Sequence, residues 1–302
     1  MRTKKISSQN ETQSIFKNEG LASSLEWHGI SRGDKNWSVY NGDSIEVLKK
    51  LPSDSVHCVV TSPPYFWLRD YGVDGQIDLE ETVDGYVEAI CAVMSEVKRV
   101  LRPDGLLFLN IGDTYYSGKG MSQGTDKKSA KRRFGLRAVD KSGGMGIGIQ
   151  RKSILGIPWR VAIAMSTAGW VLRSPIIWHR EKCLREAATD RPSRSYEHVF
   201  MFAKDRKYYF DKQPLIEQRV EEDMWTIASR PNARNGLDTA PYPDELVKRC
   251  IEIGCPPGGV VLDPFLGSGT TARVALAMER HAIGMDLNSE FCQYSVDQLR
   301  LI

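Results

Sequence analysis

A strand–helix–strand unit near the C-terminus constrains the fold more than any other feature of the sequence. Residues 259–263 form a short run rich in valine, and residues 281–286 form a second short, mostly apolar run. Between them, residues 270–280 carry apolar side chains at helical spacing. Two strands joined by a crossover helix lie parallel in one sheet. The sequence therefore predicts an α/β fold built on a parallel sheet.

The same alternation of strands and helices extends upstream. Pro175 interrupts a predicted strand at 170–178, which indicates a sheet edge or a bulge. Turn residues between two short apolar runs predict a hairpin from 199–203 and 207–210. The other predicted elements are strands at 55–61 and 106–111 and helices at 83–101, 157–168, 243–250 and 289–301.

Length and composition limit the classes of protein that are compatible with this chain. Its 302 residues, 41% of them hydrophobic, fit one globular unit at residues 26–302, preceded by a polar, flexible arm at residues 1–25. No run of eighteen apolar residues and no secretory pattern is present, which predicts no membrane partner and a cytoplasmic location. None of the six cysteines forms a CxxC pair, so we expect free thiols and no metal site.

Positive charge is concentrated in one segment. Residues 117–152 hold ten lysines and arginines and two acidic residues, a net charge of +8, while the rest of the chain carries −5. This glycine- and serine-rich segment has no periodicity and is predicted to be a mobile loop. It is either a solvated surface loop or a contact for a polyanion, with Lys131, Arg132 and Arg133 as the candidate contacts.

A glycine-rich turn follows the strand at 259–263. Asp263 ends the strand, Gly267 and Gly269 allow a ligand to approach the backbone, and the next helix begins near Thr270. Asp286, at the end of the following strand, can accept hydrogen bonds from ribose hydroxyls. A phosphate-binding loop would need a lysine before Thr270, so a nucleoside without a polyphosphate fits better than ATP. A plain glycine-rich turn is the alternative.

A second motif, Thr-Ser-Pro-Pro-Tyr at 61–65, follows the strand at 55–61 directly. Pro63 and Pro64 remove two N–H donors, so carbonyl groups and the Ser62 hydroxyl remain as acceptors beside the Tyr65 ring. Such a set suits a flat ring that carries an amino group. A Pro-Pro turn with a half-buried tyrosine is an equally good interpretation of this motif alone.

Together, DPFLGSGTT at 263–271 and TSPPY at 61–65 resemble the paired signatures of DNA amino-methyltransferases. TSPPY comes first, which is similar to the permuted β-type order of restriction-modification enzymes. Four further segments resemble this family: 41–43, which approaches the cofactor adenine there, 176–180, 190–198, which is typical of N4-cytosine-like members, and 239–246, a cofactor-pocket segment. The resemblance covers the chain from about Trp37 to its C-terminus.

The resemblance implies a doubly wound, mostly parallel sheet of the S-adenosylmethionine-dependent, Rossmann-like methyltransferase type, with an inserted loop and a target-recognition region at 183–236. It implies S-adenosyl-L-methionine as the cofactor. The catalytic residues that it implies are Ser62, Pro63, Pro64 and Tyr65, and the cofactor-binding residues are Asp43, Asp263, Pro264, Phe265, Gly267, Ser268, Gly269, Thr270, Thr271 and Asp286.

The resemblance further implies site-specific methylation of N4 of a flipped-out cytosine in double-stranded DNA, with adenine N6 as the alternative target. Arg191, Arg194 and Arg234 are candidate DNA contacts beside those of the basic loop. A cognate restriction endonuclease and the oligomeric state stay open. A DNA-binding protein without enzymatic activity is a more remote alternative. Methylation of cytosine carbon 5 would need a nucleophilic cysteine after proline, and no cysteine here follows one.

Overall fold

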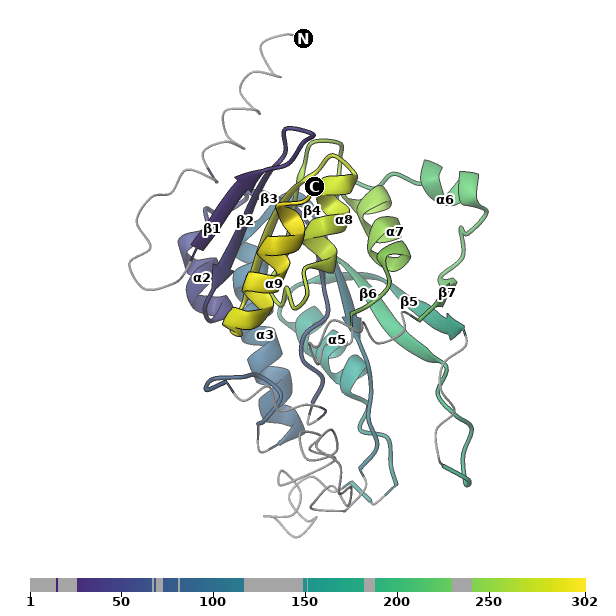
Figure 1. Ribbon diagram of the computed structural model, residues 1–302. Helices are drawn as coiled ribbons and strands as arrows, with labels where there is room; N and C mark the ends of the chain where they lie inside the picture. The colour runs from purple at the N-terminus through teal and green to yellow at the C-terminus, as the bar shows by residue number, and fades with distance from the viewer. Residues whose placement is uncertain are drawn as a thin grey trace.

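The computed structural model describes residues 15, 26–66, 68, 73–80, 82–116, 149–150, 152–181, 188–229 and 241–302. Its centre is a nine-stranded sheet with the order β1-β2-β9-β8-β3-β4-β6-β5-β7 (Figure 1). The strands are β1 (Glu26–Ile30), β2 (Asn36–Asn41), β3 (Val56–Thr61), β4 (Leu101–Ile111), β5 (Val171–Glu181), β6 (Tyr196–Ala203), β7 (Met224–Ala228), β8 (Val260–Asp263) and β9 (His281–Asp286). The helices are α2 (Ser44–Lys50), α3 (Val83–Val100), α5 (Ile157–Thr167), α6 (Gln213–Gln218), α7 (Asp244–Gly254), α8 (Thr270–Ala277) and α9 (Ser289–Leu299).

The sheet is mostly parallel, as predicted. Strands β2, β9, β8, β3 and β4 pair in parallel, whereas β6 is antiparallel to both of its neighbours, β4 and β5. The chain passes from β3 through α3 to β4 in one direction along the sheet, and from β8 through α8 to β9 in the other. The boundary between β3 and β8 is therefore a topological switch point, where open α/β sheets leave a crevice at the carboxyl ends of their strands.

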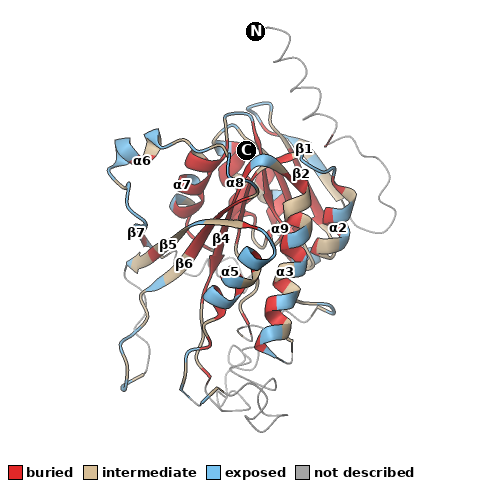
Figure 2. Cartoon of the chain, turned by 180° about the vertical axis from the view of Figure 1, so that it is seen from behind, coloured by how far each residue is buried: buried red, intermediate tan, exposed pale blue. Residues whose placement is uncertain are grey.

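Helices cover both faces of the sheet, which confirms the doubly wound α/β fold class. Successive side chains of a strand point to opposite faces. Val59 and Leu107 accordingly join the core cluster that includes α2, α3 and α5, while Cys58 and Phe108 join the cluster that includes α7, α8 and α9. Figure 2 shows the buried side of these helices turned toward the sheet and the exposed side turned outward.

Two predicted details of the sheet are corrected by the structure. Residues 207–210 form no strand, so the predicted hairpin is wrong; β6 pairs with β4 and β5 instead, and the Tyr209 amide donates to the Asp104 carbonyl at 2.8 Å. β5 is not an edge strand, because it lies between β6 and β7. Its register does shift between Leu172 and Ser174, and its pairing with β7 begins only at Ile177, so Pro175 removes no bond to β7.

Two predicted segments lie largely outside the described residues. Within the N-terminal 25 residues the structure describes Ile15, whose side chain is 6% exposed and belongs to the core cluster of α2 and α3. Of the basic segment 117–152 it describes 149–150 and 152. Among the described residues, no helix is long and apolar enough to cross a membrane.

The first turn of α3 is fixed by a side-chain cap. The Thr82 hydroxyl accepts a hydrogen bond from the Gly85 amide at 2.9 Å, which satisfies one of the free amides at the start of the helix. We expect Thr82→Ala to lower the free energy of unfolding by about 1 kcal/mol. Urea denaturation followed by circular dichroism measures this change, with Thr82→Ser, which keeps the hydroxyl, as the control. Equal losses in both variants would show that the cap does not stabilise α3.

Candidate active site

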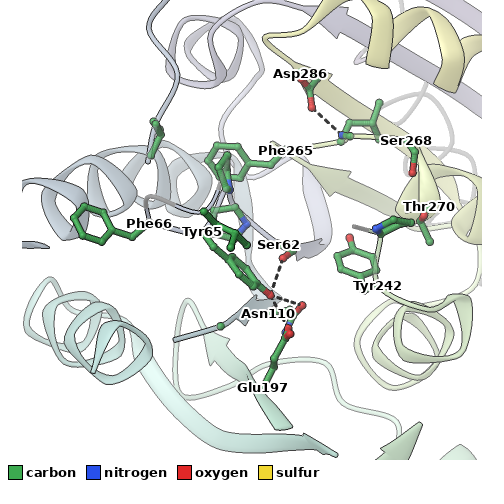
Figure 3. A pocket seen from close by; sticks show the side chains of 18 of the residues that line it. Ser62, Tyr65, Phe66, Asn110, Glu197, Tyr242, Phe265, Ser268, Thr270 and Asp286 are labelled. Carbon is green, nitrogen blue, oxygen red and sulfur yellow. Dashed lines mark hydrogen bonds between the residues drawn. The ribbon is translucent and has the colours of Figure 1, made fainter. Parts of the chain in front are cut away.

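A cavity of about 970 Å³ lies where β3, β4 and β8 end (Figure 3). The segment that follows β3 supplies Ser62, Pro63, Pro64 and Tyr65 to its wall, and the turn that follows β8 supplies residues 265–268 and Thr270. The two sequence motifs are thus brought together at the switch point of the sheet, although they lie far apart along the chain.

The Asp263 carboxylate joins the two motifs. Its Oδ1 accepts a hydrogen bond from the Thr61 hydroxyl at 2.6 Å and from the Phe265 amide at 3.0 Å, while its Oδ2 accepts one from the Thr271 hydroxyl at 2.6 Å. The Tyr242 hydroxyl donates to the same Oδ2 at 3.1 Å. Burial raises the pKa of Asp263, and these hydrogen bonds oppose the rise.

Asp286 faces the cavity from the end of β9. Its two carboxylate oxygens accept hydrogen bonds from the amides of Gly267 at 2.8 Å and Asn288 at 2.9 Å. Gly267 has a positive φ of 54°, a conformation that favours glycine and that turns its amide toward the carboxylate. Burial raises the pKa of Asp286 to about 6. A carboxyl group held in this way presents lone pairs to a polar ligand in the cavity.

The proline pair leaves one carbonyl group for a ligand. The Pro64 carbonyl accepts a hydrogen bond from the Tyr86 hydroxyl at 2.8 Å. Among the described residues, no hydrogen bond reaches the Pro63 carbonyl. Pro63 and Ser62 therefore offer a carbonyl and a hydroxyl side by side at the cavity wall.

Tyr65 points across the floor of the cavity toward β4 and β6. Its hydroxyl donates to Glu197 Oε2 at 2.6 Å, and it accepts a hydrogen bond from Ser62 Oγ at 3.5 Å (Figure 3). A β-carbon on Gly112 would lie 2.5 Å from the Tyr65 ring, so only glycine leaves room for this ring. Burial, then the neighbouring Glu197 carboxylate, raises the pKa of Tyr65 well above its usual value.

Three polar residues of this floor are not among the predicted site residues, although two of them, Arg180 and Glu197, lie in the segments 176–180 and 190–198 that resemble the family. Asn110 is the penultimate residue of β4 and is 4% exposed; its amide donates to Glu197 Oε2 at 3.2 Å and to the His198 carbonyl at 3.1 Å. Arg180 of β5 donates to Glu197 Oε1 at 3.1 Å. A polar residue at the carboxyl end of an otherwise apolar strand was the available signal for Asn110, whereas Glu197 and Arg180 become neighbours only through the pairing of β5 with β6.

The predicted cofactor-binding residues divide into two groups. Asp43, Phe265, Gly267, Ser268, Thr270 and Asp286 line the cavity. Asp263, Pro264, Gly269 and Thr271 do not line it and lie behind its wall. Gly269 is the N-cap residue of α8, with φ 81°. A β-carbon there would lie 2.8 Å from the Ser295 hydroxyl, so glycine allows α8 to pack closely against α9. The Pro264 carbonyl accepts a hydrogen bond from Ser44 Oγ at 2.6 Å.

Two of the predicted DNA contacts lie near the cavity. The Arg191 guanidinium stands 3.7 Å from the centre of the Tyr115 ring, and that of Arg194 stands 5.2 Å from it. Arg194 also donates to the Asp113 carbonyl and lines the cavity. Arg194 is thus part of the wall. Lys131, Arg132, Arg133 and Arg234 lie outside the described residues.

Comparison with known proteins identifies relatives of this chain. A family model described as DNA methylase, N6_N4_Mtase, matches residues 56–297. The type II methyltransferase M.XycI of Xanthomonas campestris pv. cyanopsidis is 42% identical over 269 residues, which cover 87% of each protein.

Solved structures share the fold. The PvuII DNA methyltransferase (cytosine-N4-specific) superposes with a TM-score of 0.66 at 20% identity, over 90% of each chain. A putative DNA modification methylase of Thermus thermophilus, solved in complex with S-adenosyl-L-methionine, has a TM-score of 0.58 at 26% identity, over 86% of this chain and 93% of that one.

The family model spans both motifs and the strands that present them, and M.XycI matches the chain over most of its length. These matches confirm the family predicted from the two motifs: the chain belongs to the DNA methylases of the N6_N4_Mtase family.

Proposed function

We propose that this DNA methylase transfers a methyl group from S-adenosyl-L-methionine to the exocyclic N4 of a cytosine flipped out of double-stranded DNA. One observation carries the proposal. Ser62 Oγ and the Pro63 carbonyl, two acceptors for an amino group, lie on the same cavity as the Gly267–Asp286 pair, a site that suits a nucleoside.

The residues of the β8–β9 side fit the cofactor. Each Asp286 oxygen already accepts one backbone amide, and a carboxylate oxygen has capacity for a further hydrogen bond, here from a ribose hydroxyl. Phe265 and Phe291 both line the cavity and offer apolar surface to an adenine ring. When bound, S-adenosyl-L-methionine supplies an electrophilic methyl group attached to a sulfonium.

The residues of the β3 side would activate the amine. The lone pair of an exocyclic amine is delocalised into the ring, so the nitrogen is a weak nucleophile. Acceptance of its two hydrogens by Ser62 Oγ and the Pro63 carbonyl favours a tetrahedral nitrogen and offsets the positive charge that develops on it. Holding both reactants in one cavity supplies much of the remaining rate enhancement.

A base inside a duplex cannot reach this cavity, so we infer that the target nucleotide is flipped out and stacks against Tyr65. The basic segment 117–152 would contact DNA phosphates, and residues 183–236 would contribute to target recognition. Arg191 and Arg194, whose guanidinium groups lie beside the Tyr115 ring, belong to the N-terminal part of this region.

The choice of cytosine over adenine rests on Ser62. By resemblance, serine before the proline pair is the pattern of N4-cytosine enzymes, whereas adenine N6 enzymes usually carry an acid or an amide there and only some of them carry serine. Adenine N6 is the second candidate, because its amine can donate to the same two acceptors.

Cofactor binding should depend on the ionised form of Asp286. Because its pKa lies at about 6, the carboxyl group is protonated below that pH and loses acceptor capacity. We expect the dissociation constant to rise about tenfold for each pH unit below 6. Asp286→Ala should weaken binding at pH 7.5 by about 1.5–3 kcal/mol and abolish the pH dependence. Calorimetry measures both, with Asp297→Ala on the exposed face of α9 as the control. Unchanged affinity in Asp286→Ala would place the cofactor elsewhere.

The DNA affinity should depend strongly on salt. If about five cations of segment 117–152 neutralise phosphates, log K falls with log salt at a slope of roughly −4 to −5 from this segment. Replacing Lys131, Arg132 and Arg133 together with glutamine should flatten the slope by about 2–3 units. Fluorescence anisotropy at several salt concentrations measures this slope. If the triple variant has the slope of the native protein, these three cations do not contact phosphates, and the segment is a solvated surface loop.

The target base is tested by nucleoside mass spectrometry of DNA treated with the protein and labelled cofactor. We expect N4-methylcytosine, and N6-methyladenine as the labelled product would contradict the proposal. Ser62→Ala should slow the methylation step by roughly tenfold to a thousandfold, since one acceptor bond is lost in the transition state. Its cofactor affinity should match that of the native protein, which separates a catalytic role from a structural one.

A further inference from the structure

A hydrogen-bonded chain leads from Ser62 into the interior of the protein. Ser62 Oγ donates to the Tyr65 hydroxyl at 3.5 Å, and the Tyr65 hydroxyl donates to Glu197 Oε2 at 2.6 Å (Figure 3). Both hydroxyl groups donate away from the target amine. The lone pairs of Ser62 Oγ are therefore available to accept a hydrogen from the amine, and each step of the chain runs in the direction in which a proton would leave.

The Glu197 carboxylate at the end of this chain accepts hydrogen bonds from three side chains. The Glu197 side chain is 13% exposed, and the guanidinium of Arg180 lies 3.1 Å from Oε1 and balances its charge. The Asn110 amide donates to Oε2 at 3.2 Å. Arg180 also donates to the Arg194 carbonyl at 3.3 Å, which fixes the guanidinium. A nearly buried carboxylate without a place in the proposed cofactor site or among the two amine acceptors needs a further explanation.

Methylation of an amine creates a proton that must be removed. As the nitrogen forms its bond to the methyl carbon, the carbon–sulfur bond breaks and the sulfur keeps the electron pair. The nitrogen then carries a positive charge and both of its original hydrogens, and the neutral methylated base results only when one of them is lost. An acceptor on the protein beside the amine can take this proton directly.

We propose that Glu197 is the terminal proton acceptor of a relay from the target amine through Ser62 and Tyr65. The amine proton passes to Ser62 Oγ, the Ser62 proton to the Tyr65 hydroxyl oxygen, and the Tyr65 proton to Glu197 Oε2. Ser62 and Tyr65 each gain one proton and lose one, so both hydroxyl groups are restored, and the Glu197 carboxylate becomes a carboxylic acid. This proposal rests on the proposed methylation of an exocyclic amine and adds a residue that acts through Tyr65 and Ser62.

The first test is Glu197→Gln, which keeps the size of the side chain and an oxygen that accepts from Tyr65 but cannot take up a proton at neutral pH. In a single-turnover assay with labelled S-adenosyl-L-methionine, we expect methylation of DNA to slow roughly a hundredfold. The cofactor affinity and the melting temperature should match those of the native protein. Glu197→Asp, which keeps the carboxylate, should recover part of the rate.

The second test removes the middle of the relay. Tyr65→Phe lacks the hydroxyl that joins Ser62 to Glu197, so we expect a loss similar to that of Glu197→Gln. The double variant should be no slower than the slower single variant, because residues that act in one pathway are not additive.

The control is Glu96→Gln. Glu96 also pairs with an arginine, at 2.8 Å from Arg99, but it lies on α3 and does not line the cavity. Its variant should methylate DNA at the native rate. A native rate in Glu197→Gln overturns the relay, as does a slow rate that Glu197→Asp does not improve. If Glu197→Gln fails to fold, a native rate in Tyr65→Phe overturns it. Failure of the native protein itself to methylate DNA would instead refute the proposed function.

Discussion

The site depends on one buried carboxylate, that of Asp263. It is 2% exposed and accepts hydrogen bonds from Thr61 at the end of β3 and from Thr271 in the first turn of α8. A buried carboxylate is costly unless its lone pairs are satisfied, and here hydroxyl groups and an amide satisfy them. The cost of an unsatisfied Asp263 fixes the distance between the two motifs, so the cavity between them has a defined width. Asp263 therefore shapes the site without lining it.

The position of the cavity follows from the topology of the sheet. β3 and β8 are neighbours, and the chain leaves them in opposite directions through α3 and α8. Because the two connecting helices diverge from that boundary, a crevice opens at the carboxyl ends of the two strands. The crevice depends on which strands are neighbours in the sheet and not on which motif comes first in the sequence. The two motifs therefore meet at β3 and β8 although Thr61 and Asp263 are 202 positions apart along the chain.

The part of the site that follows parallel strands could be predicted from the sequence, and the part built by antiparallel strands could not. Turns after parallel strands have local signatures, such as the glycines after Asp263 and the prolines after Thr61, and parallel strands bring such turns to one edge. Glu197 lies in segment 190–198, which resembles the family, but it reaches the cavity because β6 runs antiparallel between β4 and β5. That strand pairing leaves no local pattern, so the resemblance alone does not assign Glu197 to the site. The same long-range pairing made the predicted hairpin at 199–210 wrong. For the basic segment 117–152, most of which lies outside the described residues, the predicted DNA contact rests on the charge pattern of the sequence.

The two sides of the cavity differ in how they are built, and this difference bears on how such an enzyme could change its target. On the β8–β9 side, Asp286 is held by the backbone amides of Gly267 and Asn288. The rise of its pKa from 3.8 to about 6 means that the folded protein disfavours the ionised form by about 3 kcal/mol, a cost that a ligand donating to the carboxylate offsets. Opposite, the Tyr65 hydroxyl is held by side chains, those of Glu197 and Asn110. Backbone donors stay when a side chain is replaced, whereas a side-chain network changes with each substitution. Substitutions around Asp286 therefore leave its two amide donors in place on the side that we propose binds the cofactor, whereas substitutions at Glu197 or Asn110 remove partners of Tyr65 on the side that we propose binds the target base.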